Sequence, residues 1–494
     1  MAPRLLTVLA MFFVAAAPAK ADLVQLNWAH GQKGARLARA AGGTELAHEL
    51  RIWRVPGYAV ADLRRAGVVR ISRIERLFPT LALAQLQATD PLVPQQWWRA
   101  AVGSDKVESP GAGKPVTVVD SGIDLTHPEF ATRPNTTALN PQTTTDTDED
   151  HGTEVSSIVG APNNGVGIVG IYPDAVLRVW DASPFGFLNE GSAIQGIYEA
   201  AKRGPGVINL SFGGEDDDPM LDDAIRFAFR SGSLIVAAAG NDGAAGNPPN
   251  YPAFYPHVLT VGATNETNHV ASFSSVSPSV DVVAPGVRMV VAEPTSLDSS
   301  GYITANGTSF AAPLVAGAAA WVWTVRPELD NTQLFEIMRR SATDIGAPGF
   351  DNASGYGLLN VPSALNFPAP SRDPQEPNEK PRQIEPHGLF PNGTPPLTVP
   401  GRTSRSISAR VDRSEDPIDL YRAWAPAGLV LRARVSGAVT VRLLVRASHV
   451  RALAVGKNGV AAFRNRGKGV YVYVEVRPAA RLAQYQLHLT AARR

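Results

Sequence analysis

From Pro115 onward the sequence repeats one pattern: a short apolar segment, a turn, and a segment with helical periodicity. The apolar segments are PVTVVD at 115–120, VLRVWDA at 176–182, GVINLSFGG at 206–214, LIVAAAGN at 234–241, VLTVGATN at 258–265 and VDVVAPG at 280–286. Helical segments lie among them, notably 191–203, 219–231 and 308–325. Apolar strands that alternate with helices are typical of a parallel sheet covered by helices. We therefore expect an α/β fold with its functional residues at the carboxyl ends of the strands.

The distribution of charge divides the chain into three parts. Residues 22–100 have 11 basic and 6 acidic side chains, residues 101–370 have 12 and 30, and residues 401–494 have 18 and 5. A basic front, an acidic middle and a basic tail indicate separate units, although the formal net charge is only +1. The expected boundaries are a signal peptide over 1–21, a small α+β domain over 22–85, the α/β domain over 90–365, a linker over 366–400 and a β-sandwich over 401–494.

The N-terminus has the features of an export signal. Arg4 precedes an apolar run at 5–17, and Ala19-Lys20-Ala21 supplies small residues for cleavage. The apolar run is short for a membrane span, which favours a cleaved signal. The alternative is an uncleaved anchor. We expect a secreted protein, extracellular or in the periplasm or cell envelope, with no membrane span after signal removal. The chain has no Cys, which excludes disulfides, thiolate metal sites and a cysteine nucleophile.

The segments on either side of the α/β region have different patterns. Residues 22–80 alternate strand-like and helical stretches in a small βαβαβ arrangement. Residues 366–400 are rich in Pro and polar residues, as linkers are. Beyond them, short alternating strands such as LVLRARV at 429–435 predict an all-β sandwich.

Three polar residues stand where the α/β pattern would place functional groups. Asp120 ends an apolar strand, His151 precedes a helical run, and Ser309 lies at the start of a small-residue helix. Each also has a structural explanation, as a turn-capping Asp, a helix-start His and a Ser N-cap. Together the three residues suit nucleophilic catalysis. A serine hydroxyl needs a base that takes its proton, and a carboxylate orients that base.

The order Asp, His, Ser along the chain is that of subtilisin. DSG at 120–122, HGT at 151–153 and GTSFAAP at 307–313 resemble the motifs of the subtilisin-family serine proteases, the subtilases. The resemblance covers about residues 90–365 and implies a subtilisin-like fold with Asp120, His151 and Ser309 as the catalytic triad. It also implies that Asn241, in AAAGNDG, belongs to the oxyanion hole. The structural alternative is an Asn chosen for positive φ in a turn.

The same resemblance suggests where substrate binds. Ser211, Phe212 and Gly213 match the strand that pairs with an extended peptide. Ala239 and Gly240 would form a wall of the primary specificity pocket, where small residues leave room for large apolar side chains. One departure is Glu154, which stands where many subtilases have a second histidine.

The flanking segments also have counterparts in such proteases. Residues 22–85 resemble a propeptide, which would act as an intramolecular inhibitor and be cut between Pro79 and Asp90. EPN at 376–378, with Asp419 and Tyr421, resembles the bacterial pre-peptidase C-terminal domain. The role of this basic domain stays open between a scattered solvated surface and a surface for anionic polymers.

No cofactor is required for the expected chemistry. Structural calcium is compatible with the fold, and its site is left open. DTDED at 146–150 and EDDD at 215–218 are acidic enough to supply oxygen ligands, but neither has a diagnostic spacing. The second run directly follows the expected substrate strand, so a solvated loop and a reader of basic substrate residues are further alternatives.

The sequence therefore predicts a secreted serine endopeptidase, made as a zymogen, that acts on proteins or peptides through an acyl-enzyme. It gives no indication of a nucleic-acid partner. One alternative is a maturation protease dedicated to a single partner, which a narrowed or charged cleft would favour. The other is a non-catalytic binding protein on a subtilase scaffold, which a missing triad residue would favour.

Overall fold

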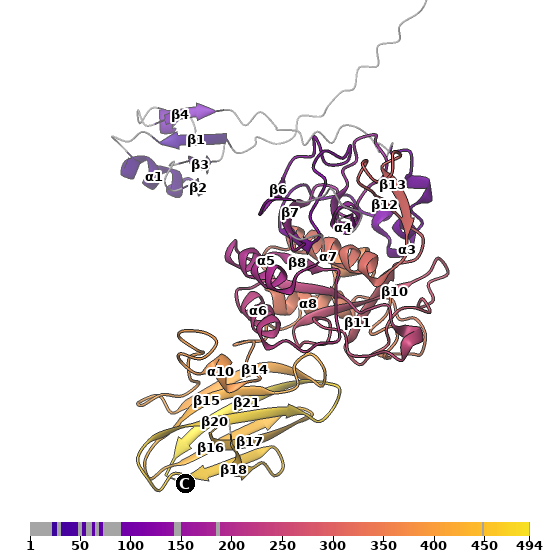
Figure 1. The fold of residues 1–494 in the computed structure, drawn as a ribbon. Helices are drawn as coiled ribbons and strands as arrows, with labels where there is room; N and C mark the ends of the chain where they lie inside the picture. The colour runs from indigo at the N-terminus through magenta and orange to yellow at the C-terminus, as the bar shows by residue number, and fades with distance from the viewer. Residues whose placement is uncertain are drawn as a thin grey trace, which may run out of the picture. The chain divides into compact units, whose positions relative to one another are not determined.

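The computed structural model describes residues 22–26, 31–47, 52–55, 62–64, 69–72, 90–142, 150–183, 188–446 and 449–493. The chain forms two compact units, Met1–Gln87 and Ala88–Arg494 (Figure 1). The expected signal peptide and the expected cleavage segment between Pro79 and Asp90 lie outside the described residues.

The first unit contains a four-stranded sheet and one long helix. The elements are β1 (Asp22–Leu26), α1 (Gly31–Ala40), β2 (Thr44–Ala47), β3 (Ile52–Val55) and β4 (Val69–Ser72). The strand order is β2-β3-β1-β4, and the paired strands are antiparallel. The arrangement differs from the βαβαβ pattern by β2, a short strand that pairs with β3.

The second unit is built on a seven-stranded sheet in the order β11-β10-β9-β8-β5-β7-β6. The strands are β5 (Pro115–Asp120), β6 (Thr136–Ala138), β7 (Val176–Asp181), β8 (Val207–Leu210), β9 (Leu234–Ala238), β10 (Val258–Thr264) and β11 (Val280–Pro285). All of these pairs are parallel, which confirms the α/β prediction. Because the strands run the same way, the residues that follow β5, β8 and β9 lie at one edge of the sheet.

Helices pack against this sheet. They are α3 (Trp98–Val102), α4 (His151–Gly160), α5 (Glu190–Lys202), α6 (Pro219–Arg230), α7 (Thr308–Val325), α8 (Asn331–Arg340) and α9 (Val361–Asn366). A hairpin of β12 (Met289–Ala292) and β13 (Tyr302–Ala305) precedes α7. Among the described residues, α7 alone has the length and apolar character of a membrane span, and 83% of its apolar window is buried inside the protein. It is the central helix of the core.

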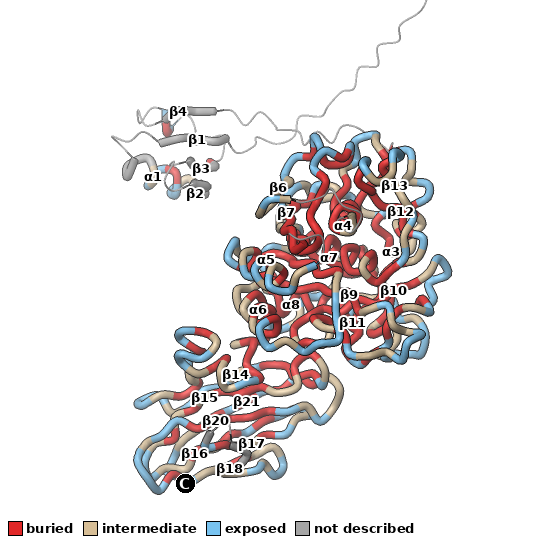
Figure 2. The backbone as a smooth tube through the Cα atoms, in the orientation of Figure 1, coloured by how far each residue is buried: buried red, intermediate tan, exposed pale blue. Residues whose placement is uncertain are grey.

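The C-terminal part forms two four-stranded antiparallel sheets around one core, which confirms the predicted all-β architecture. One sheet contains β14 (Ser404–Asp412), β21 (Leu482–Ala492), β16 (Val430–Ser436) and β19 (Val460–Arg464). The other contains β15 (Asp419–Ala425), β20 (Val470–Pro478), β17 (Val439–Arg446) and β18 (His449–Val455). Figure 2 shows that buried residues recur along the strands of both sheets.

The Pro-rich segment 366–400 is packed against its neighbours. It contains the short helix α10 (Pro381–Ile384). Its residues Asp373, Glu376 and Glu379 are buried. Glu379 pairs with Arg226 of α6, and Asp373 pairs with Arg410 of β14. Ion pairs therefore tie this segment to both the α/β domain and the sandwich.

Candidate active site

Asp120 and His151 meet directly at the carboxyl end of β5. Asp120 ends the strand and is fully buried, while His151 is the first residue of α4. The Nδ1 atom of His151 lies 2.8 Å from Oδ1 of Asp120, and the backbone N–H of Ser121 donates to the same oxygen at 2.8 Å. This contact leaves Nε2 as the ring nitrogen available to a reacting group.

The glycine after His151 allows this contact to form. A Cβ atom on Gly152 would lie 2.1 Å from the carbonyl oxygen of Gly122, so only glycine fits there. Its N–H donates to the hydroxyl of Ser121 at 2.9 Å. The start of α4 is therefore docked on the turn after β5, and this docking fixes the position of His151.

Ser309 lies in the first turn of α7 and is bonded to the end of β8. Its hydroxyl donates to the carbonyl oxygen of Ser211 at 3.0 Å, and the hydroxyl of Ser211 donates to the carbonyl oxygen of Ser309 at 2.8 Å. The second bond compensates for Pro313, which lies inside the helix and has no N–H for the carbonyl four residues earlier. The rings of His151 and Phe310 are 5.8 Å apart, so the histidine lies beside the start of α7.

Asn241 also faces the start of α7. Its Oδ1 atom accepts from the backbone N–H of Thr308 at 2.9 Å and from the Thr308 hydroxyl at 3.0 Å. These bonds orient the amide so that Nδ2 is its remaining donor. The positive φ in this turn belongs to Gly240, at 104°, and not to Asn241. The need for a positive φ therefore does not explain the asparagine at position 241.

The expected substrate-binding residues line the same edge of the sheet. Ser211, Phe212 and Gly213 follow β8, and Gly213 is exposed. Ala239 and Gly240 follow β9, and the N–H of Gly240 donates to the Thr308 hydroxyl at 3.2 Å. Both segments therefore contact the start of α7, one through Ser211 and the other through Gly240.

Acidic neighbours shape the electrostatics of His151. Burial alone would lower the pKa of His151, but the charge and hydrogen bond of Asp120 outweigh it, and Glu154 and Asp150 add to the effect, so that the pKa is raised to about 9. Burial raises the pKa of Glu154 to about 8, and that of Glu293, which follows β12, to about 7. Sequence reasoning missed Glu293, because it belongs to no motif and reaches the site only through the β12–β13 hairpin.

The two acidic runs have different surroundings. In the run at 215–218, Asp217 accepts from the hydroxyl of Tyr255 at 3.0 Å, and Asp218 caps α6 through the N–H of Met220 at 2.6 Å. Glu215 and Asp216 are exposed. Most of the run at 146–150 lies outside the described residues.

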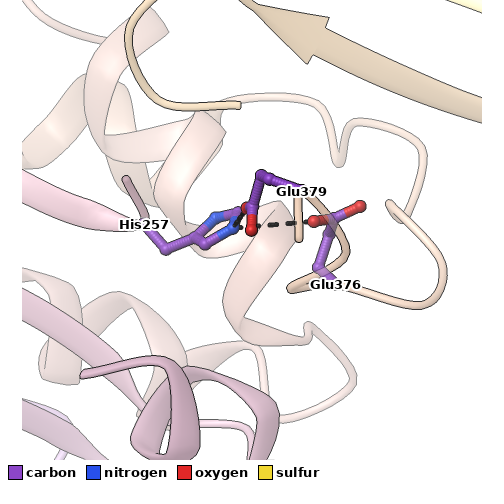
Figure 3. Close-up of side chains that lie close together, drawn as sticks. All are labelled: His257, Glu376 and Glu379. Atoms are coloured by element: carbon purple, nitrogen blue, oxygen red, sulfur yellow. Dashed lines mark hydrogen bonds and ion pairs between the residues drawn. The ribbon is translucent and has the colours of Figure 1, made fainter. Parts of the chain in front are cut away.

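Two groups of buried side chains within the described residues could hold a metal ion. One is His257, Glu376 and Glu379, and the other is Asp373, Glu376 and Asp419. Figure 3 shows His257 and Glu379 in contact, with Glu376 beside them. Neither group belongs to the acidic runs that the sequence suggested.

The parallel sheet and the residues gathered at its edge define a subtilisin-like serine endopeptidase. The family model for the subtilase family matches residues 111–357, and the chain belongs to that family. Subtilisin Savinase from Lederbergia lenta is 38% identical over 257 residues, which make up 51% of this chain and 91% of the relative. The minor extracellular protease Epr from Bacillus subtilis is 36% identical over 55% of this chain and 40% of its own length. This chain therefore spans less than half of Epr.

The comparison with solved structures also gives a match over part of this chain. The psychrophilic subtilisin-like protease Apa1 from Pseudoalteromonas sp. AS-11 covers 56% of this chain and 99% of its own, with a TM-score of 0.49 and 18% identity.

Proposed function

We propose that this chain is a secreted serine endopeptidase that cleaves proteins or peptides through Asp120, His151 and Ser309. The observation that carries the proposal is the 2.8 Å contact between His151 and Asp120, beside the first turn of α7, which contains Ser309. Ser309 attacks the peptide carbonyl, and His151 takes its proton and then passes it to the leaving amine. Asp120 holds the imidazole in the required tautomer, and water resolves the acyl-enzyme.

Stabilisation of the oxyanion falls to Asn241 and the start of α7. The oxygen of the Asn241 amide is held by Thr308, which presents the amide nitrogen as a donor. The backbone N–H of Ser309 lies in the first turn, where N–H groups have no partner within the helix. Donors fixed before the reaction stabilise the charge that develops in the transition state.

The zymogen is the second part of the proposal. The first compact unit, Met1–Gln87, precedes the protease domain and has its own small sheet, as a propeptide would. We infer that it inhibits the cleft until it is cut off, after the export signal has been removed. The name of the Epr relative, an extracellular protease, supports secretion.

The test is labelling of the full chain with a serine-directed phosphonate, followed by peptide mapping. A mass shift is expected on Ser309 and on no peptide of Ser309→Ala. The variant should also accumulate as a precursor that has lost only its signal. Ser300→Ala, an exposed serine in the hairpin before α7, is the control and should be labelled and processed normally. Normal hydrolysis by Ser309→Ala would refute the proposal.

A further inference from the structure

The arginines on the two outer faces of the sandwich have different electrostatic surroundings. Residues 401–494 contain 18 basic and 5 acidic side chains, so most of the basic ones cannot be paired within the domain. On the sheet β15-β20-β17-β18, Arg442 and Arg477 both contact the carboxylate of Glu475, at 2.7 and 2.8 Å. The basic charge of that outer face is therefore partly balanced.

The sheet β14-β21-β16-β19 has three arginines on its outer face. Core residues alternate with outward residues along its strands, and Arg432 and Arg434 of β16 and Arg464 of β19 stand at outward positions. Arg434 and Arg464 are exposed, and Arg432 is partly exposed. Arg432 is opposite Ala462, so Arg464 is its diagonal neighbour. The Cα atom of Arg432 is thus about 7 Å from those of the other two, and we call the three the arginine group.

The arginine group has no acidic neighbour. No described residue forms an ion pair or a hydrogen bond with its guanidinium groups. Among the outward positions of these four strands, which the structure describes in full, the acidic residue is Asp412, and it is buried in contact with Arg339 of α8. Asp412 pairs with Leu482, whereas Arg434 pairs with His488, about 20 Å further along β21. The mutual repulsion of the three charges is therefore left for an external anion to offset.

Short polar side chains surround the arginine group. Ser404 and Ser406 of β14 and His488 and Thr490 of β21 stand on the same face, and the Ser406 hydroxyl lies 2.7 Å from Nδ1 of His488. Ala462 is exposed beside Arg432. Because these side chains are short, the longer arginines extend beyond them, above a surface that offers hydroxyl and imidazole groups for hydrogen bonds.

We propose that this face binds an acidic polysaccharide, a chain of sugars that carry carboxylates, through Arg432, Arg434 and Arg464. The planar guanidinium matches a carboxylate with two parallel hydrogen bonds. Neighbouring serine, threonine and histidine side chains suit the hydroxyl groups of sugars. Several closely spaced positive charges on an open face favour a polymer with repeated negative charges over a small anion. The binding goes beyond the proposed peptidase activity and does not depend on it.

Other anionic partners are less well supported. Single-stranded nucleic acids stack their bases on exposed aromatic rings, membrane surfaces take up apolar side chains, and protein partners are usually anchored by aromatic residues. From the pair of Ser408 and Gln486 to the far end of the face, the described outward positions include no Phe, Tyr, Trp, Leu, Ile or Met. The face therefore supplies charge and hydrogen bonds without the side chains that those partners need.

The test measures binding of full-length protein in the Ser309→Ala background, which prevents self-digestion, to polygalacturonate and to neutral dextran. We expect binding to polygalacturonate alone, and high salt should weaken it. Arg432→Gln/Arg434→Gln should lower the affinity roughly three- to twenty-fold, as expected for two exposed charge pairs. Lys202→Gln/Arg203→Gln removes the same charge from α5 and is the matched control, with unchanged affinity expected.

A second variant separates a binding role from a structural one. Ala462→Glu places a carboxylate opposite Arg432 without removing an arginine. It should raise the thermal midpoint or leave it unchanged, because it adds a cross-strand ion pair, and it should weaken polygalacturonate binding. An affinity that neither Ala462→Glu nor Arg432→Gln/Arg434→Gln changes overturns the proposal.

The other partners are tested with the same protein at the same salt concentration. Tighter binding to a single-stranded oligonucleotide or to phosphatidylglycerol vesicles than to polygalacturonate overturns the proposal. So does self-association that Arg432→Gln/Arg434→Gln abolishes while polygalacturonate fails to bind, which would assign the face to the acidic protease domain of a second copy.

Discussion

The side-chain amide of Asn241 has an acceptor oxygen and a donor nitrogen, and we expect the two to act differently. Its oxygen accepts both hydrogen bonds from Thr308, and its nitrogen remains as the donor that the proposed mechanism assigns to the substrate carbonyl. The contact with substrate would strengthen as negative charge develops on the carbonyl oxygen. It should therefore affect the transition state more than the bound ground state.

For this reason Asn241→Ala is expected to lower kcat by roughly 10²–10³ with little change in KM. Steady-state kinetics on a peptide substrate would measure both constants. Asn247→Ala, in the loop that follows, serves as the control. A raised KM with unchanged kcat would assign Asn241 to substrate binding instead.

Glu154 gives the histidine a second acidic neighbour, after Asp120. His151 must be neutral to accept the proton of Ser309, so kcat/KM should rise with pH and level off only near the raised pKa of about 9. Glu154→Gln removes a negative charge that favours the protonated imidazole. The rising limb should then move to lower pH, most clearly above the pKa of Glu154, about 8, where the parent carboxylate is ionised.

The measurement is the pH dependence of kcat/KM for the parent and Glu154→Gln. Glu108→Gln, an exposed position before β5, is the control and should leave the profile in place. An unmoved limb in Glu154→Gln would mean that Glu154 stays protonated throughout and does not act on His151.

The four acidic residues of the loop before α6, at 215–218, differ in their contacts. Asp217, although exposed, accepts from the hydroxyl of Tyr255, and Asp218 caps α6, whereas the exposed Glu215 and Asp216 take no part in these two contacts. Glu215 and Asp216 directly follow the expected substrate strand. This division favours Asp216 over Asp217 as a residue that meets charged substrates.

We accordingly predict a preference for Lys or Arg upstream of the scissile bond, beside an apolar residue at that bond. Asp216→Asn should weaken this preference by roughly two- to five-fold at low salt, as expected for an exposed charge pair. High salt should weaken it in the parent as well. A peptide library profiled at two salt concentrations checks both effects, with Glu266→Gln as the control. A profile unchanged by salt and by substitution would show that the loop does not read charge.

The sequence predicted elements best where one pattern ran without interruption. β5 and β7–β11 consist mainly of apolar residues, and α5–α7 were recognisable as helical runs, so their places agree with the structure within a few residues. β15, β18 and β19 were not predicted as separate strands, because mixed sequences such as DLYRAWA become strands only when the sandwich pairs them. The triad candidates followed from motifs. The buried carboxylates Asp373, Glu376 and Glu379 did not, because their burial depends on how the 366–400 segment packs.

For the whole molecule, the buried ion pairs between α6 and the 366–400 segment should matter more than the exposed ones. Arg226 contacts Asp222 and Glu379, and all three side chains have 4% exposure or less. Arg203 makes a similar pair with Glu199 at 2.8 Å, but those side chains have 38% and 27% exposure. Lys380 also contacts Asp222 and His257 also contacts Glu379, but loss of Arg226 removes the one guanidinium that is buried between both carboxylates. Breaking a buried pair costs far more than the loss of an exposed pair.

Arg226→Ala should therefore lower the free energy of unfolding by about 3–5 kcal/mol. Arg203→Ala, its matched control, should lower it by about 1 kcal/mol or less. Urea unfolding of both variants in the Ser309→Ala background would measure the difference. An equal loss of unfolding free energy in the two variants would contradict a stabilising role for the buried ion pairs of Arg226.

The paired hydroxyls of Ser211 and Ser309 have a consequence for attempts to re-engineer this protease. The strand that would grip the peptide and the residue that would cut it are 98 positions apart in sequence, yet each holds the other's backbone carbonyl. Because Pro313 leaves the Ser309 carbonyl without its helical donor, Ser211 is the residue that fills the gap. In the proposed mechanism, selectivity and turnover therefore both depend on this pair of hydrogen bonds. A library that varies position 211 to change what is cut will also change how fast it is cut.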